Sequence, residues 1–219
     1  MSEEILKALM QLFAIIAKQD GGVEDSEIDF VESFLTTQLS SDFVEEYMAL
    51  FYKHAGIEDR AEYMEKKEKG EVKLTSVKDS VRILGICKKI NKTLTQEQKV
   101  VVLVRVFELV AADKKFSEQR LAIINTVAEV FNISPEEFRA TETFVVNDTG
   151  AELDIQSALI IDDREKVFEN AKHIRSDDLH KEVFILQIKS VELYFLRYTG
   201  SQDLLLNGLP VRSNRIYLF

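Results

Sequence analysis

The feature that most constrains the fold is a helix–turn–helix unit that occurs twice in the chain. Residues 17–35, AKQDGGVEDSEIDFVESFL, have the pattern of one helix end, an acidic turn and the start of a second helix. Residues 111–131, AADKKFSEQRLAIINTVAEVF, form a looser copy. With one residue gapped, the aligned pairs are Phe13 with Phe107, Ala17 with Ala111, Asp20 with Asp113, Val23 with Phe116, and Phe30 with Ile123. Repetition at this spacing predicts an internally duplicated helical bundle.

Apolar residues in the first half recur with the period of an amphipathic helix. The first helix is predicted from Ile5, Leu9, Leu12 and Ile16, and it ends before Gly21 and Gly22, because glycine readily takes the left-handed conformation at helix ends. Two further helices are predicted with buried stripes at Ile28, Val31, Phe34 and Leu35, and, after a cap at Ser40 or Ser41, at Phe43, Tyr47, Leu50 and Phe51. The charged segment 60–71 predicts a short helix that is mostly solvated.

The second half has clearer helix starts. Ser76 with Asp79 and Thr95 with Gln98 fit the reciprocal capping arrangement, and Ser134 precedes a proline at the first helical position. The segment that follows Thr95 is apolar on nearly every face, as a helix in the middle of a bundle requires, despite its valine run. Seven or eight helices are therefore expected up to about residue 146.

The composition then changes towards short β-type runs. Residues 147–156 lack helical periodicity and are predicted to be a linker. Strands are predicted in 157–161, 182–188, 191–198, 203–206 and 215–219, and Asn207-Gly208 is a hairpin signal. The predicted class is mainly α: a duplicated helical bundle over 1–146, the linker, and a small all-β domain or fragment over 157–219. Because the last run ends in mid-strand, we expect the chain to be a piece of a longer protein.

Negative charge is concentrated at the start of the chain. Up to Arg60 there are 13 acidic and 4 basic residues, against 25 and 24 in the remainder. Such a field attracts cations and basic surfaces and repels nucleic-acid backbones, so nucleic acid is not an expected partner. The longest apolar run, residues 100–112, is too short to cross a bilayer, and a single cysteine, Cys87, favours a reducing, cytoplasmic location.

The acidic turn resembles that of the tellurite-resistance TerB-like family. The likeness lies in an Asp-Gly-x-Val-x-x-x-Glu signature formed by Asp20, Gly21, Val23 and Glu27, with a weaker second copy at Asp113 and Phe116. It covers roughly the first two-thirds of the chain. The resemblance implies an all-helical pseudo-twofold bundle with an acidic face, in a family associated with divalent cations and with membrane-linked stress or resistance complexes. The second copy departs from the pattern, because Lys114 replaces the glycine and Arg120 stands where Glu27 would pair.

Two interpretations of the acidic turn remain open at this point. The first is a calcium or magnesium site assembled from Asp20, Glu24, Glu27, Asp113 and Glu118, whose oxygen ligands suit hard cations. An EF-hand is excluded, because its sixth and twelfth positions lack the required glycine and glutamate. The second is helix capping without any metal, which stabilises a helix start by about 0.5 to 2 kcal/mol.

No other candidate residue in the sequence indicates a catalytic site. His54, His173 and His180 lack the close pairing of a zinc site or a triad in sequence, and each is expected at the surface. Cys87 lies on the apolar stripe of its helix and is expected to be buried. Sequence motifs for nucleotide binding, serine hydrolysis and zinc proteolysis are absent from the chain.

The C-terminal segment DLLLNGLPVRSNRIYLF resembles the end of a forkhead-associated (FHA) β-sandwich, without recognisable phosphothreonine-binding elements. A TerB-like bundle followed by such a sheet is similar to the N-terminal part of bacterial ABC-transporter ATPase chains. The expected function is a cytoplasmic sensor or adaptor module whose acidic face binds a divalent cation or a protein partner, in association with a membrane complex but without entering the membrane. The alternatives are a metal-dependent hydrolase that uses the carboxylates of the turn, and a structural spacer.

Overall fold

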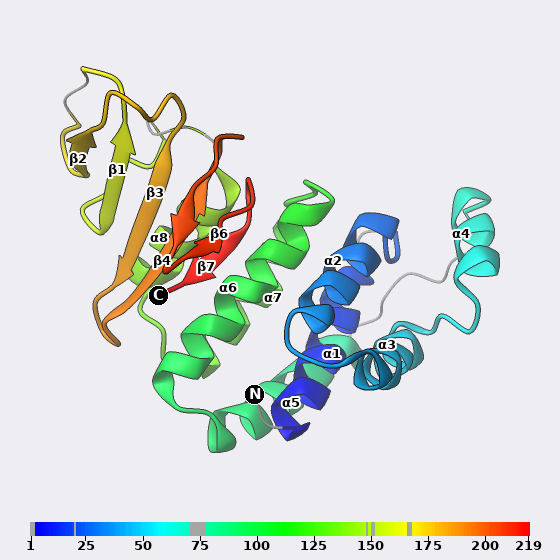
Figure 1. Cartoon of the computed structure of the whole chain (residues 1–219). Helices are drawn as coiled ribbons and strands as arrows, with labels where there is room; N and C mark the ends of the chain where they lie inside the picture. The colour runs from blue at the N-terminus through cyan, green and yellow to red at the C-terminus, as the bar shows by residue number, and fades with distance from the viewer. Residues whose placement is uncertain (1–2, 20, 71–77, 148, 150–151, 166–167) are drawn as a thin grey trace. The chain divides into compact units, whose positions relative to one another are not determined.

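The computed structural model describes residues 3–19, 21–70, 78–147, 149, 152–165 and 168–219 (Figure 1), with the side chains of 4–5 and 78–80 left out. The chain divides into two compact units, Met1–Ser134 and Pro135–Phe219. Each unit is described by itself. Among the described residues, no helix is both long and apolar enough to cross a membrane.

The described part of the first unit contains seven helices. They are α1 (Glu3–Ala17), α2 (Asp25–Thr36), α3 (Ser41–Ala55), α4 (Arg60–Glu68), α5 (Lys78–Thr93), α6 (Gln96–Ala112) and α7 (Glu118–Val130). With α8 (Pro135–Val146) in the second unit, they confirm the prediction of a mainly helical chain with seven or eight helices. The start predicted at Ser76 lies outside the described residues, whereas the cap at Thr95 is confirmed by reciprocal hydrogen bonds with Gln98.

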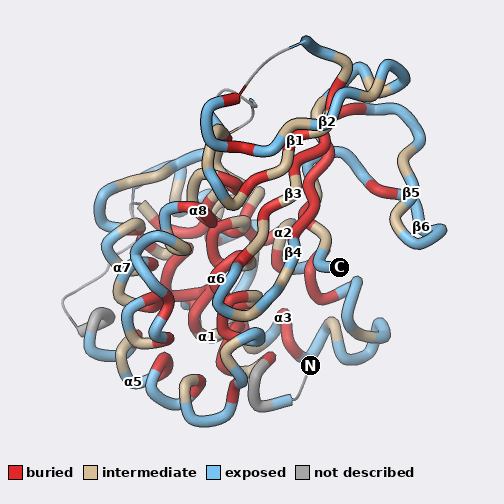
Figure 2. The backbone as a smooth tube through the Cα atoms, turned by 90° about the vertical axis from the view of Figure 1, so that its left-hand side faces the viewer, coloured by how far each residue is buried: buried red, intermediate tan, exposed pale blue. Residues whose placement is uncertain are grey.

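The core of the first unit forms around α1 and α6, the equivalent helices of the two repeats. These helices pack against each other, α1 also contacts α3 and α5, and α6 also contacts α2 and α7. Both are buried along most of their length, as the red tube in Figure 2 shows. The valine-rich α6 is therefore a helix, as predicted, because burial on nearly every face outweighs the β preference of valine.

The predicted core stripe of α3 is only partly confirmed, because Leu50 is half-buried and Phe43 is exposed. Tyr47 and Phe51 are buried as expected, but 54% of Phe43 is exposed. The hydroxyl of Tyr47 already reaches the backbone of Glu3, the first residue of α1. Phe43 lies one turn earlier in α3, so it extends past the start of the helix against which α3 packs.

The second unit is a sheet with one helix. The strands are β1 (Ala158–Asp162), β2 (Lys172–Arg175), β3 (Val183–Ile188), β4 (Leu193–Tyr198), β5 (Leu205–Leu206), β6 (Leu209–Pro210) and β7 (Ile216–Leu218). Five of them form a sheet in the order β2-β1-β3-β4-β7, in which only the β1–β2 pair is parallel. The predicted hairpin is confirmed: β5 pairs with β6 across Asn207 and Gly208, which both have positive φ, at 53° and 80°.

The expected helical body reached residue 146, but the first compact unit ends at Ser134 and α8 packs against β3 of the second. Arg197 of β4 donates to the carbonyls of Val145 and Asn147 at the C-terminal end of α8. Ser190, between β3 and β4, donates to the carboxylate of Glu137 near the start of α8. The described part of the expected linker also packs, since Leu153 is fully buried.

Strand β2 was not predicted from the sequence. Its residues, KHIR, are mostly exposed because β2 lies at the edge of the sheet, so they show no alternation of apolar and polar side chains. It also brings His173 within 3.0 Å of the buried carboxylate of Asp162. The expectation of a surface residue is therefore wrong for His173, whose side chain is 15% exposed, while His180 is exposed as expected.

Candidate functional site

The two acidic turns share a positive φ at one aligned position. After α1, Gly21 and Gly22 take positive φ values of 112° and 92°. In the second copy Lys114 stands where Gly21 would be, and it also has a positive φ, 58°. This conformation is uncommon for a residue with a side chain, so its retention at Lys114 supports duplication of the whole turn. Asp20 itself lies outside the described residues.

Each turn is followed by a helix with a capped start. In the first copy the carboxylate of Glu27 accepts a hydrogen bond from the backbone N–H of Glu24, at 2.9 Å. In the second copy, Ser117 occupies the position of Glu24 and accepts from the N–H of Arg120 at 3.1 Å. Side-chain capping hydrogen bonds are therefore present at both helix starts, made by Glu27 in the first copy and by Ser117 in the second.

Arg120 joins the two turns from inside the molecule. Its side chain is 1% exposed, and its guanidinium lies 2.6 Å from Asp113 and 3.1 Å from Glu27. It also donates to the backbone carbonyls of Ala17 and Gln19, at 3.2 and 3.3 Å. One buried cation thus contacts a carboxylate from each repeat and the C-terminal end of α1, where negative backbone dipoles favour positive charge.

The protonation of Glu27 reflects two opposing effects. Burial away from water raises its pKa, and the nearby Arg120 lowers it, with burial the larger cause. The resulting pKa is about 7. We call the place where the two acidic turns meet, formed by Glu24, Glu27, Asp113 and Arg120, the corner. Glu27 is its carboxyl with a pKa near neutral pH.

Glu24 faces two lysines. Its carboxylate lies 2.6 Å from the ammonium of Lys67 in α4, and its other oxygen accepts from Lys115 in the second turn. Burial acts to raise the pKa of Glu24, but the hydrogen bonds from Lys115 and Lys67 lower it below its ordinary value. Glu24 is therefore an ionised carboxylate that is already compensated by the chain's own cations.

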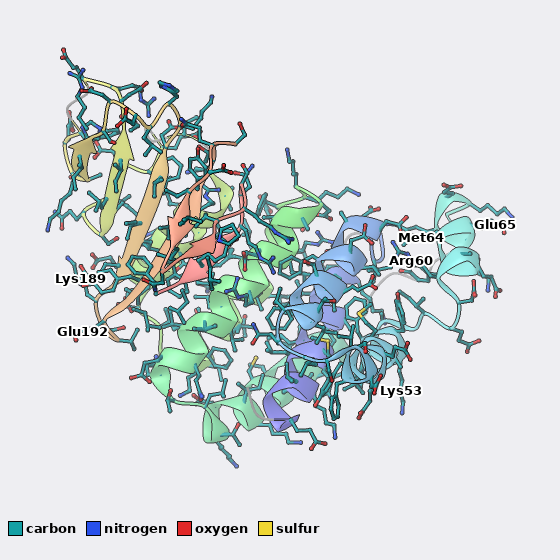
Figure 3. The ribbon with its side chains drawn as sticks, in the orientation of Figure 1. Lys53, Arg60, Met64, Glu65, Lys189 and Glu192 are labelled. Carbon is teal, nitrogen blue, oxygen red and sulfur yellow. The ribbon has the colours of Figure 1, made fainter. Side chains whose placement is uncertain are left out.

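Helix α4 is a short and mostly exposed helix, as predicted, but one of its faces contacts the first turn and the start of α2. Its residues Arg60, Tyr63 and Lys67 have the spacing i, i+3, i+7 and so share one face of the helix. Arg60 reaches Asp25 and Asp29 of α2, and Figure 3 labels it between the two helices. Sequence reasoning missed these three residues. Their spacing shows that they share one face of the helix, but nothing in the charged sequence around them indicated a contact with the first turn.

The five predicted metal ligands do not all lie together in the structure. Glu24, Glu27 and Asp113 come together at the corner, where each contacts an Arg or Lys side chain. Glu118 lies exposed in the first turn of α7, and Asp20 is not described. Within the described ranges, no three Asp, Glu, His or Cys side chains converge as a metal site would require.

Comparison with known protein families agrees with the geometry of the corner. The sequence profile of the family described as "Tellurite resistance protein TerB" matches residues 6–143. The chain belongs to the TerB family. No curated protein and no solved structure matched the chain.

The match extends over the whole of the duplicated corner and through most of α8, although α8 packs with the sheet of the second unit. The TerB signature residues that are described, Gly21, Val23 and Glu27, all belong to the turn and to the helix start it caps. Of the chain's departures from that signature, Lys114 keeps the positive φ of the glycine it replaces, and Arg120 contacts Glu27.

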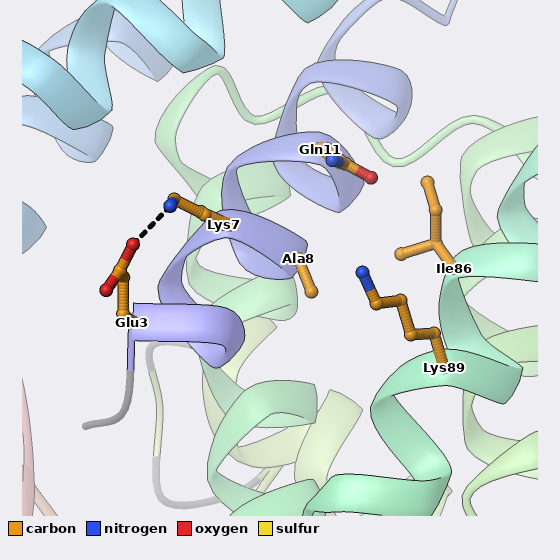
Figure 4. A pocket seen from close by; sticks show the side chains of 6 residues that line it. All are labelled: Glu3, Lys7, Ala8, Gln11, Ile86 and Lys89. Atoms are coloured by element: carbon orange, nitrogen blue, oxygen red, sulfur yellow. Dashed lines mark hydrogen bonds and ion pairs between the residues drawn. The ribbon is translucent and has the colours of Figure 1, made fainter.

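A separate cavity of about 280 Å³ lies between α1 and α5 of the TerB region. Its lining residues are Glu3, Lys7, Ala8, Gln11, Ile86 and Lys89 (Figure 4). None of the corner carboxylates lines it. Cys87, the neighbour of Ile86, is fully buried as predicted, and burial raises the pKa of its thiol to about 12, so it is not an activated nucleophile.

Proposed function

We propose that this chain is a non-catalytic, cytoplasmic interaction module of the tellurite-resistance type that binds a basic surface of a protein partner. The binding surface is the outer face of α2, where Asp25, Asp29 and Glu32 follow one another at i, i+4 and i+7. We call these three residues the acidic stripe. All three are exposed. Opposite charges on two partners speed their encounter and select against wrong partners, which suits an adaptor.

The proposal rests on a difference between two groups of carboxylates, those that face the interior and those that face the solvent. The inward ones, Glu24, Glu27 and Asp113, contact Lys67, Lys115 and Arg120. The outward ones form the stripe. A divalent cation at the corner would have to displace Arg120 from contacts with two carboxylates and two carbonyls. The inward group therefore supports the fold. In the outward group, Asp25 and Asp29 contact Arg60 of α4 through solvent-exposed pairs, which a basic partner can compete for.

The same contacts weigh against the alternative of a metal-dependent hydrolase. Such an enzyme needs convergent acids in a concave site, with an open coordination position for water or substrate. The cavity between α1 and α5 is lined by Lys7 and Lys89 and by none of the carboxylates of the acidic turns. The family match concerns TerB and supports a module over an enzyme.

Two measurements on the purified chain test the proposal. A fluorescein-labelled oligolysine peptide should bind, and the reversal Asp29→Lys/Glu32→Lys should weaken that binding by about tenfold or more. The matched control is Glu136→Lys/Glu192→Lys, which changes the net charge equally at exposed positions of the second unit (Glu192 is labelled in Figure 3) and should bind as the wild type does. Equal loss in both variants would overturn the assignment of the stripe.

Calorimetric titration with calcium and magnesium chloride addresses the cation. We expect no binding heat and no rise in melting temperature at millimolar ion, because the inward carboxylates are compensated by Arg120 and the two lysines. A saturable heat would overturn this part of the proposal and would restore the cation-sensor alternative.

The second unit extends the proposal to a larger context. Its sheet and its Asn-Gly hairpin support the resemblance to FHA domains, and a TerB region joined to such a sheet is expected in ABC-transporter ATPase chains. The test is the complete reading frame, in which a downstream Walker A loop would support the transporter context and a stop codon directly after Phe219 would contradict it.

A further inference from the structure

Helix α4 already places Arg60 on two residues of the acidic stripe, and Tyr63 and Lys67 on the turn that precedes it. We propose that α4 covers the docking surface within the same chain and competes with the partner for it. The partner is then a basic helix that presents Arg, an aromatic residue and Lys at i, i+3 and i+7, and it displaces α4 when it binds. This inference rests on the proposed function, since it names the kind of partner that the stripe accepts and the segment that competes with it.

The first contact is a single guanidinium that bridges two carboxylates. Arg60 lies 2.6 Å from Asp25 and 2.8 Å from Asp29, which are one helical turn apart on α2. Guanidinium groups suit this task because their donors point in fixed directions towards carboxylates. The spacing of the stripe thus matches an arginine at the start of a docked helix.

The other two contacts lie along the same face of α4. The hydroxyl of Tyr63 accepts from the backbone N–H of Val23 at 2.9 Å, and Tyr63 is the buried residue of α4. Lys67 donates to the carbonyl of Val23 at 2.9 Å and contacts the carboxylate of Glu24. Tyr63 and Lys67 thus hold the turn, and Arg60 holds α2.

Two further lysines, Lys66 in α4 and Lys69 at its C-terminal end, pair with carboxylates of the same helix. Lys66 pairs with Glu62, and Lys69 pairs with Glu65, each at i, i+4. Those pairs do not involve α2. The basic character of the docking face therefore comes from Arg60 and Lys67, and the helix offers a natural control in Lys66 and Lys69.

The strength of these contacts makes displacement feasible. The Arg60 side chain is 38% exposed and its partners are 60% and 66% exposed, and ion pairs at such exposure contribute little and weaken with salt. Tyr63 is the buried residue of α4, and the Lys67–Glu24 pair, with side chains 16% and 29% exposed, is the less exposed of its ion pairs with the turn and α2. A longer basic helix with the same three contacts and a larger apolar face would outcompete α4, although α4 benefits from being tethered to the site.

The test uses the full chain and a fluorescein-labelled alanine-based helical peptide that carries Arg, Tyr and Lys at i, i+3 and i+7. The release variant Arg60→Glu/Lys67→Glu should bind the peptide about tenfold more tightly than the wild type, because α4 no longer competes. The matched control Lys66→Glu/Lys69→Glu makes the same change of net charge on the same helix, away from α2. It should bind as the wild type does.

Each other outcome has a definite meaning. Equal binding by the wild type and the release variant would show that α4 does not compete for the stripe, and it would leave the proposed function unaffected. Binding of oligolysine without binding of the helical peptide to the release variant would overturn the helical partner. Failure of both probes would overturn the proposed function as well. Light scattering tests a further outcome. If the wild type is a dimer and Arg60→Glu/Lys67→Glu dissociates it, the stripe is covered by α4 of a second copy, which contradicts the proposal of a contact within one chain.

Discussion

Glu27 and Arg120 hold equivalent positions in the two repeats, and their carboxylate and guanidinium lie 3.1 Å apart in the core. Both side chains are almost completely buried. A duplicated unit that kept glutamate at both positions would bring two acids together here. The exchange of one glutamate for arginine turns a repulsive pair into an attractive one, so the duplicated body holds its own counter-charge.

The first prediction concerns removal of that counter-charge. Arg120→Met should lower the free energy of unfolding by about 3–5 kcal/mol, because it leaves Glu27 and Asp113 buried without compensation. Urea denaturation followed by circular dichroism measures the loss. Arg139→Met, at an exposed position of α8, is the control and should change stability by less than about 0.5 kcal/mol. A loss below about 1 kcal/mol for Arg120→Met would show that the pair is not needed for compensation.

The second prediction is a pH dependence that Glu27 adds to stability. Its pKa is raised from the ordinary 4.5 to about 7 in the folded chain, chiefly by burial. Between these values the folded state holds a proton that the unfolded state has released. The contribution of Glu27 to stability is therefore complete below about pH 4.5 and is lost as the pH rises through about 7.

The measurement compares the wild type with Glu27→Gln, which keeps a hydrogen-bond acceptor at the helix start. The unfolding free energy of the wild type relative to this variant should fall by about 2–3 kcal/mol across that range. Because every other titrating group is common to both proteins, the difference isolates Glu27. A difference that stays flat with pH would contradict the raised pKa.

The third prediction tests the capped start of α7 with a matched pair of serines. Ser117→Ala should cost about 1 kcal/mol, because the serine oxygen accepts from the N–H of Arg120. Ser40→Ala should cost less, since Ser40 precedes α3 but its side chain makes no capping hydrogen bond. Thermal denaturation of the two variants provides the comparison. Equal losses would mean that serine's backbone preference, not its hydrogen bond, stabilises the α7 start.

Local signals in the sequence were sufficient for most of the helical body. The period of apolar residues and the capping pair Thr95 and Gln98 predicted α6 correctly, because both are short-range properties of the chain. The hairpin at Asn207 was predicted for the same reason. Even the departure at Arg120 was visible in the alignment of the repeats, although its buried contacts with Asp113 and Glu27 required the fold.

What the sequence concealed depends on contacts between distant segments. Tyr63 meets the N–H of Val23, which is 40 residues away in the chain, so nothing local marks α4 as a docked helix. Phe43 has the helical spacing of a core residue but extends past the end of its neighbour. Strand β2 is a short edge strand whose residues are mostly exposed, and its pairing with β1 depends on the register of the sheet.

The last prediction concerns the attachment of α8 to the sheet. Arg197 is 4% exposed, and it donates to the carbonyls of Val145 and Asn147 while its guanidinium lies 5.4 Å from the ring centre of Phe184. Arg197→Met keeps most of the volume but leaves those carbonyls without a donor, which should cost about 2 kcal/mol and speed amide hydrogen exchange in α8 roughly thirtyfold. Exchange in α1 and α6 should not change, because they belong to the other unit. Arg212→Met, at an exposed position, should leave α8 as protected as in the wild type. If α8 kept its protection in Arg197→Met, the helix would be held to the sheet by apolar packing, and the division of the chain at Ser134 would not depend on this arginine.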